Sequence, residues 1–147
     1  MYLATVIDIA SRRVVGFALA DHLRTGLVAD ALTNAVAARD PGAGVIFHAD
    51  RGCQYTSRDY ALLAGDLEVR LSTGRTGQCW DNALAESFFA QGRVPGPAAL
   101  AHPGRGTPGH RGLHRLVHGT RLHSALGYQT PDEFESTTRN KVTAQAA

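Results

Sequence analysis

The sequence predicts an α/β fold, because stretches with the composition of β-strands alternate with stretches of helical periodicity. Two apolar runs at residues 2–8 and 14–20 flank a turn-forming stretch at residues 10–13. A helical stripe follows, and after it comes a short apolar run at residues 45–48. The 147 residues fit one domain, and an apolar content of 44% is sufficient for a core.

The predicted secondary structure begins with an antiparallel hairpin formed by the first two apolar runs. Thr25 is the expected cap of the helix that follows, and the Asp40-Pro41-Gly42 sequence should end it. Apolar residues at helical spacing form one stripe on this helix, namely Leu27, Val28, Ala31, Leu32, Ala35 and Val36. We expect this stripe to pack on the sheet.

The run at residues 45–48 suits a buried parallel strand that is reached through a helix crossover. It places Asp50 at the carboxyl end of the strand, where ligands of open α/β sheets gather. A following helix, capped by Thr56 or Ser57, should lead into a last edge strand at residues 68–71.

Asp50 and Glu86 form the candidate metal site. Asp50 closes an apolar strand, whereas Glu86 lies in a short helical pattern behind Asp81, which can cap that helix. Metal-dependent phosphoryl transfer requires hard oxygen ligands on rigid elements, because two ions about 4 Å apart must hold the attacking and leaving oxygens. The pairing therefore indicates half of a two-metal site.

Four stretches of the chain carry a recognisable pattern. They are Leu3-Ala-Thr-Val-Ile-Asp-Ile-Ala-Ser-Arg-Arg, His48-Ala-Asp-Arg-Gly-Cys-Gln-Tyr-Thr-Ser, Gly77-Gln-Cys-Trp-Asp-Asn-Ala-Leu-Ala-Glu-Ser and Arg121-Leu-His-Ser-Ala-Leu-Gly-Tyr-Gln-Thr-Pro. Together they resemble the integrase-core transposases of bacterial insertion sequences, which are similar to retroviral integrases. The resemblance implies a ribonuclease-H-like mixed sheet flanked by helices, an Asp-Asp-Glu triad, two Mg²⁺ or Mn²⁺ ions and DNA strand transfer.

In that resemblance Asp50 and Glu86 are the second and third acids, and the first acid would lie on a strand upstream of Tyr2. Asp8 belongs instead to the turn of the hairpin. A chain that lacks the first strand and its acid should coordinate metal weakly, so we expect this polypeptide to be inactive alone. A separate upstream transposase polypeptide could supply the strand.

The domain organisation departs from the family after residue 90. Residues 1–90 correspond to a partial integrase catalytic core, 120–136 to a C-terminal transposase motif, and 137–147 to a flexible tail. Residues 91–119 are an irregular basic segment rich in Gly and Pro, which cannot sustain a helix. We interpret this segment as the product of two compensating changes of reading frame, which the DNA of the locus can test.

The resemblance also indicates DNA-binding residues, which are Arg51, Gln54, Tyr55, Thr56 and Arg121. Arg51 either contacts phosphate through its guanidinium group or only pairs with Asp50. The polar residues after it either position the DNA backbone or serve ordinary turn and helix-cap roles. The motif that contains Arg121 is expected to be structural or to face DNA.

Three further residues are candidates for supporting the acids. His48 either lines the site or packs at the end of its strand. Asn82 and Ser87 either support Glu86 through hydrogen bonds or, in the case of Asn82, help to cap the helix.

The expected function is a transposase core fragment that binds element ends and target DNA, and a homo-oligomer is one expected state. The alternative is a DNA-binding fragment or regulator of transposition that does not cut. No apolar stretch approaches the roughly 20 residues that span a bilayer, so a cytoplasmic location is expected. Cys53 and Cys79 lack the spacing of a zinc or redox motif and should be free thiols.

Overall fold

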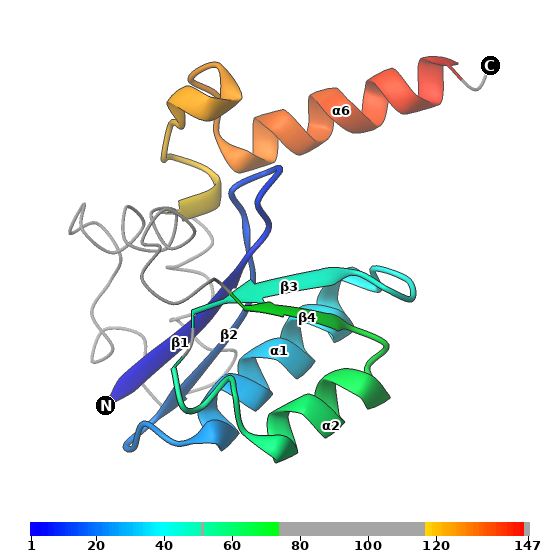
Figure 1. Ribbon diagram of the computed structural model, residues 1–147. Helices are drawn as coiled ribbons and strands as arrows, with labels where there is room; N and C mark the ends of the chain where they lie inside the picture. Colours follow the sequence, from blue (N-terminus) through cyan, green and yellow to red (C-terminus); the bar gives the residue numbers. More distant parts are fainter. Residues whose placement is uncertain (51, 74–116, 146–147) are drawn as a thin grey trace. The chain divides into compact units, whose positions relative to one another are not determined.

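The computed structural model describes residues 1–50, 52–73 and 117–145, which form helices and small β-sheets (Figure 1). The predicted α/β class is therefore confirmed. The chain divides into two compact units. Unit 1 comprises Met1–Val6 and Val15–Gln91, and unit 2 comprises Ile7–Val14 and Gly92–Ala147. No helix within the described residues is long and apolar enough to cross a membrane.

The first two strands, β1 (Tyr2–Ile7) and β2 (Val14–Ala20), pair in a two-stranded sheet and confirm the predicted hairpin. Gly16 on β2 lies against the first helix, α1 (Thr25–Arg39). A Cβ atom on Gly16 would lie 2.4 Å from the Ala31 carbonyl oxygen and 2.5 Å from the Ala35 nitrogen. The lack of a side chain at this position is what allows the strand to approach the helix so closely.

Helix α1 starts and stops through backbone geometry. The predicted cap at Thr25 is wrong, because Arg24 is the extended N-cap residue and Thr25 is the first helical residue. At the other end Asp40 adopts a left-handed conformation with φ 43°, and its N–H donates to the Val36 carbonyl oxygen over 2.8 Å. The predicted stop at Asp40-Pro41-Gly42 is confirmed.

The second sheet joins β3 (Ile46–Ala49) to β4 (Arg70–Thr73) in parallel, with Ile46 opposite Arg70 and Ala49 opposite Thr73. The strand predicted at residues 68–71 begins later, because Glu68 has φ 55°, which no strand residue adopts. The expected burial of β3 is wrong at Ile46, which is 62% exposed. Within the described residues β4 is the one strand paired with β3, so part of β3 stays accessible.

The core of unit 1 lies between its helices and strands. A cluster of buried residues joins α1, the second helix α2 (Arg58–Asp66) and the residue that precedes β4, and it consists of Val28, Leu32, Tyr60, Ala64 and Val69. Ala4 of β1, Phe47 of β3 and Leu71 of β4 pack against this cluster. Both pairs of strands thus contribute to one core, and the apolar stripe on α1 packs against strands as predicted.

The strands of the described residues form two separate two-stranded sheets, β1–β2 and β3–β4, where a single mixed sheet was expected. Among the described residues, each of the four strands is therefore paired along one edge and unpaired along the other. This arrangement leaves both sheets small.

Unit 2 contains the turn of the first hairpin and the C-terminal part of the chain. A short 3-10 helix, η3 (Ser124–Leu126), precedes helix α6 (Pro131–Gln145). Thr130 and Glu133 form a capping box at the start of α6: the Glu133 N–H donates to Thr130 Oγ1 over 3.2 Å, and the Thr130 N–H donates to Glu133 Oε2 over 2.8 Å. Helix α6 continues to Gln145, through most of the segment for which a flexible tail was expected.

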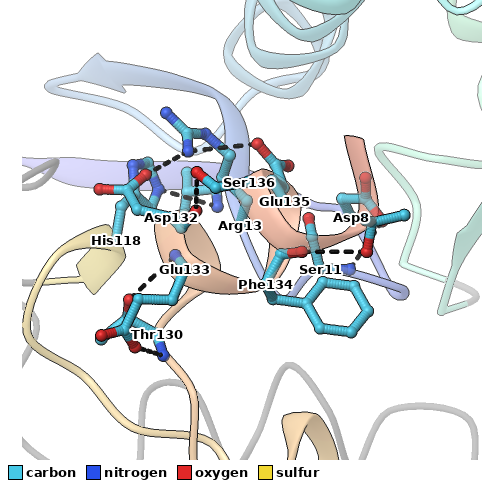
Figure 2. Close-up of polar contacts among 12 residues, drawn as sticks. Asp8, Ser11, Arg13, His118, Thr130, Asp132, Glu133, Phe134, Glu135 and Ser136 are labelled. Carbon is cyan, nitrogen blue, oxygen red and sulfur yellow. Dashed lines mark hydrogen bonds and ion pairs between the residues drawn. The ribbon is translucent and has the colours of Figure 1, made fainter. Parts of the chain in front are cut away.

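Polar contacts connect the hairpin turn to the C-terminal part within unit 2 (Figure 2). The Arg13 guanidinium donates to Asp132 and, over 3.3 Å, to Glu135, both on α6. The Val14 N–H donates to Nε2 of His118 over 3.1 Å, and His118 is only 5% exposed. His118 belongs to the segment expected to be irregular, but at this end of the segment it is part of the packed structure.

Candidate functional site

Asp50 follows directly on β3 and is exposed to solvent. Because β3 and β4 run in parallel, their carboxyl ends lie at the same edge of the sheet, and Asp50 follows Ala49, which pairs with Thr73. One oxygen of the carboxylate, Oδ1, accepts a hydrogen bond from the Gly52 N–H over 2.9 Å. The predicted position of Asp50 at the carboxyl end of a parallel strand is therefore confirmed.

The loop that follows Asp50 is compact because Gly52 has no side chain. A Cβ atom on Gly52 would lie 3.0 Å from Asp50 Oδ1 and 3.1 Å from Gln54 Oε1. The Gly52 carbonyl oxygen accepts hydrogen bonds from the backbone N–H groups of Tyr55, over 2.9 Å, and Thr56, over 3.3 Å. Asp50 and Gln54 are thus gathered around one glycine.

Tyr55 anchors this loop to the core of unit 1. Its ring centroid lies 6.2 Å from that of Phe47 on β3 and 5.6 Å from that of Tyr60 on α2, the latter in an edge-to-face arrangement. Ser57 caps α2, since its Oγ accepts from the Tyr60 N–H over 3.2 Å. Of the two caps considered for this helix, the structure thus selects Ser57.

The electrostatics of the loop reflect the nearness of Tyr55 to Asp50. Burial, and then the negative charge of Asp50, raise the pKa of the Tyr55 phenol above its usual value. Tyr55 is therefore a neutral donor at physiological pH, with its ring packed in the core. This packing favours a positioning role for Tyr55, while Thr56 is exposed and Gln54 is half-buried beside Asp50.

His48 connects the two strands that carry the site. Its Nδ1 lies 3.2 Å from the Ser72 hydroxyl oxygen, and the two residues are opposite each other in the sheet. His48 is half-buried, so it fixes the end of β3 against β4 two residues before Asp50.

Asp8 has a structural role. Its Oδ1 accepts from the Ala10 N–H over 2.8 Å and from the Ser11 N–H over 3.3 Å, which organises the hairpin turn. Arg121, the other candidate that the structure describes, is half-buried in unit 2. Four further candidates lie outside the described residues, namely Arg51, Asn82, Glu86 and Ser87.

Asp50 is the predicted metal ligand that the structure describes. Asp50 has an exposed carboxylate at a fixed position, which is the hard oxygen donor that Mg²⁺ and Mn²⁺ prefer. Within residues 1–50, 52–73 and 117–145 no cluster of three or more His, Cys, Asp or Glu side chains could hold a metal ion. Glu86, the other acid of the predicted metal site, lies outside these ranges.

From the sequence, no role was predicted for Arg13, and the Thr130–Glu133 capping box was not predicted. The capping box had a local signal, because Thr130-Pro-Asp-Glu places a cap, a proline at the first helical position and a glutamate at the third. The pairing of Arg13 with Asp132 had no such signal, since 119 positions separate the two residues. Cys53, in the loop after Asp50, is exposed and is a free thiol.

Comparison with known proteins adds a consistent set of similarities. The family model for the integrase core domain matches residues 1–79. The chain is 31% identical over 138 residues to the transposase for insertion sequence element IS904 of Lactococcus lactis subsp. lactis (strain IL1403), an alignment that covers 92% of this chain and 54% of the relative. It is 43% identical over 89 residues to transposase InsF for insertion sequence IS3A of Escherichia coli (strain K12), covering 60% of this chain and 31% of the relative. The chain thus spans about half and about a third of these two relatives.

Proposed function

The chain belongs to the integrase core domain family and is related to insertion-sequence transposases, and on this premise we propose that it is a transposase core fragment that binds DNA and holds a divalent metal ion at Asp50. The observation that carries the proposal is the position of Asp50, exposed at the carboxyl end of a parallel strand with its loop anchored by Tyr55. Rigid placement of an exposed carboxylate is what a metal ligand requires.

The residues of this chain would act by holding and orienting. Asp50 and Glu86 would be metal ligands, Arg51 would contact a phosphate, and the Gly52 N–H would fix one oxygen of Asp50. Bound Mg²⁺ or Mn²⁺ would supply charge stabilisation and an activated water for phosphodiester cleavage. A ribonuclease-H-like sheet would bring these residues together at one edge.

Metal binding at Asp50 can be measured without activity. Titration with Mn²⁺, followed by the paramagnetic broadening of amide NMR signals, should broaden the residues around Gly52 and Tyr55 first. The variant Asp50→Asn should lose this broadening. Asp66→Asn, which removes another exposed carboxylate of unit 1, should retain it. Equal broadening in both variants would mean that Asp50 is not the ligand.

Strand transfer by this chain alone is not expected, because a complete site needs a further acid. We propose that a separate polypeptide supplies a strand with that acid. The two small sheets support this idea, since β1 and β3 both pack on the same core while no described strand joins them. Main-chain pairing with an added strand is an established way to complete a sheet.

The test of this idea mixes the chain with a polypeptide that carries the proposed strand and its acid, Mg²⁺ and labelled element ends. We expect cleavage in the mixture and none with either polypeptide alone. The Asp50→Asn variant should abolish cleavage in the mixture. An inactive mixture would leave the chain as a fragment without catalytic function.

The second candidate function is a DNA-binding regulator that occupies element ends without cutting. The distribution of charge favours it, because the sequence from Ser87 to Pro131 contains arginines and no carboxylate. Gel-shift measurements at increasing salt should show binding that weakens steeply as salt rises. The absence of a shift at low salt would exclude this role.

A further inference from the structure

Arg12 occupies an unusual backbone position in the hairpin turn. Its φ is 61°, in the left-handed region where glycine and asparagine are favoured. The turn around it is closed by two hydrogen bonds of 2.8 Å, from the Arg12 N–H to the Asp8 carbonyl and from the Asp8 N–H to the Arg13 carbonyl. A glycine would suit this backbone conformation better than the arginine does.

The side chains of Arg12 and His123 both have a buried donor or acceptor atom that lacks a partner. Nη1 of Arg12 and Nε2 of His123 are buried, and neither has a hydrogen-bond partner among the described residues. Both side chains are nevertheless partly exposed as a whole, so the cluster can be approached from solvent. An unpaired buried polar atom is costly, and a guanidinium N–H costs more than a neutral group.

His123 is held in a fixed position within unit 2. Its N–H donates to the Gln129 carbonyl over 3.1 Å, and its carbonyl oxygen accepts from the N–H groups of Leu126, over 3.0 Å, and Tyr128, over 2.9 Å. These backbone hydrogen bonds thus hold His123 in a compact turn next to η3.

Arg12, Arg121 and His123 are close enough to interact electrostatically. Burial lowers the pKa of His123, and the positive charges of Arg121 and then Arg12 lower it further. Asp132 and Glu135 of the same unit accept from Arg13, and Asp8 accepts from the backbone of the turn. The cluster of Arg12, Arg121 and His123 thus brings two guanidinium groups and an imidazole near one another.

We propose that Arg12, Arg121 and His123 form a phosphate-binding site for a phosphodiester of DNA. The inference deepens the proposed function, since it names a contact for the DNA that a transposase core fragment would bind. A guanidinium group binds the oxygens of a phosphate through parallel hydrogen bonds. The negative charge of a phosphate beside His123 would offset the positive charges of the two arginines. The site is built from residues of unit 2 and does not involve Asp50.

The variant Arg12→Gly tests this site with little risk to the fold. It removes the guanidinium while giving the left-handed position the residue that suits it best. Arg24→Gly is the matched control, because it also removes one exposed arginine and glycine is tolerated at a helix N-cap. The melting temperature of both variants should lie no more than a few degrees below that of the wild type.

Binding to a duplex DNA oligonucleotide is then measured at several salt concentrations. We expect Arg12→Gly to weaken binding about tenfold and to lower the salt slope by about one, while Arg24→Gly changes affinity less than about twofold. Equal losses in both variants would show only a general effect of charge and would overturn the proposal.

A histidine NMR titration separates the possible ligands. Addition of the duplex DNA should raise the pKa of His123 in the wild type and not in Arg12→Gly. A rise with inorganic phosphate and none with DNA would mean that the site takes free anions, and the assignment to DNA would be wrong. Failure of Mn²⁺ to bind at Asp50 with an intact response of His123 would count against the metal site alone.

Discussion

Unit 1 and unit 2 are stabilised by different kinds of contact. Unit 1 is organised around an apolar cluster from α1, α2 and Val69, against which the strands pack, with the rings of Phe47, Tyr55 and Tyr60 in contact. Unit 2 buries Val117 and Leu126, but its hairpin turn is joined to the C-terminal part by Arg13 with two carboxylates and by His118, and a capping box starts α6. The free energy of apolar burial does not depend on the relative orientation of the side chains. Contacts between charged groups depend on geometry and are screened by salt. The two units should therefore respond differently to substitution, salt and pH.

The largest expected effect lies in unit 1, at the contact of β2 with α1. Gly16→Ala places a methyl group within 2.4 Å of the Ala31 carbonyl oxygen, so the strand must move away from the helix. We expect a loss of about 3 kcal/mol in the free energy of unfolding, measured with urea. Gly26→Ala is the control, because nothing lies within 4 Å of a Cβ atom there. It should be neutral or stabilising, since alanine favours a helix.

The second effect lies in unit 2, at the contact of Arg13 with Asp132 and Glu135. Arg13→Gln should lower stability by about 1.5 kcal/mol at low salt, and less at high salt, because the pairs are partly exposed. A double-mutant cycle with Asp132→Asn should give a favourable coupling energy that shrinks as salt rises. A salt-independent loss would contradict the contrast between the units.

The third effect concerns the start of α6. Thr130→Ala removes the acceptor for the Glu133 N–H and should cost about 1 kcal/mol, whereas Thr130→Ser should retain most of the stability. Hydrogen exchange in the first turn of α6 should speed up in the alanine variant. Thr137→Ala, at an exposed position of the same helix, should leave that exchange unchanged.

The smallest effect at neutral pH is expected at Tyr60, whose buried hydroxyl has no hydrogen-bond partner among the described residues. Tyr60→Phe should be neutral or stabilise by up to about 1 kcal/mol at pH 7, measured by thermal unfolding.

The effect of Tyr60 should grow in alkaline solution. Burial, and then Tyr55, raise the pKa of Tyr60, so the neutral phenol is favoured in the folded state. The stability of the folded state that depends on a neutral Tyr60 is fully present below the usual tyrosine pKa of about 10 and is lost as pH rises above that value. Tyr60→Phe should therefore lose less stability above pH 10 than wild type, while the exposed Tyr128→Phe should behave as wild type.

The parts of the fold that the sequence predicted are those with local signals. The hairpin, the stripe and stop of α1 and the serine cap of α2 each depend on residues a few positions apart. The start of β4 was misplaced because the left-handed backbone of Glu68 follows from the turn after α2 and not from strand propensity. Contacts between distant segments, such as Arg13 with Asp132, left no periodic trace in the sequence.

The candidate site was predictable to a similar extent. The place of Asp50 after a parallel strand followed from an apolar run and its position in the chain. The anchoring of its loop by Tyr55 did not, because it depends on how Phe47 and Tyr60 meet in the folded core. The functional roles of all the candidate site residues stay predictions, and four of these residues lie outside the described part of the chain, namely Arg51, Asn82, Glu86 and Ser87.

Cys53 gives the loop after Asp50 a practical use as a reporter. Its thiol is exposed and lies three positions after Asp50, in a loop whose far end is pinned by an aromatic contact. In a Cys79→Ser variant, a fluorophore or spin label attached to the Cys53 sulfur would lie in the loop after Asp50, and no core residue would be replaced. The thiol of Cys53 is thus an attachment point for a label that tests the proposed binding of metal ions and DNA near Asp50.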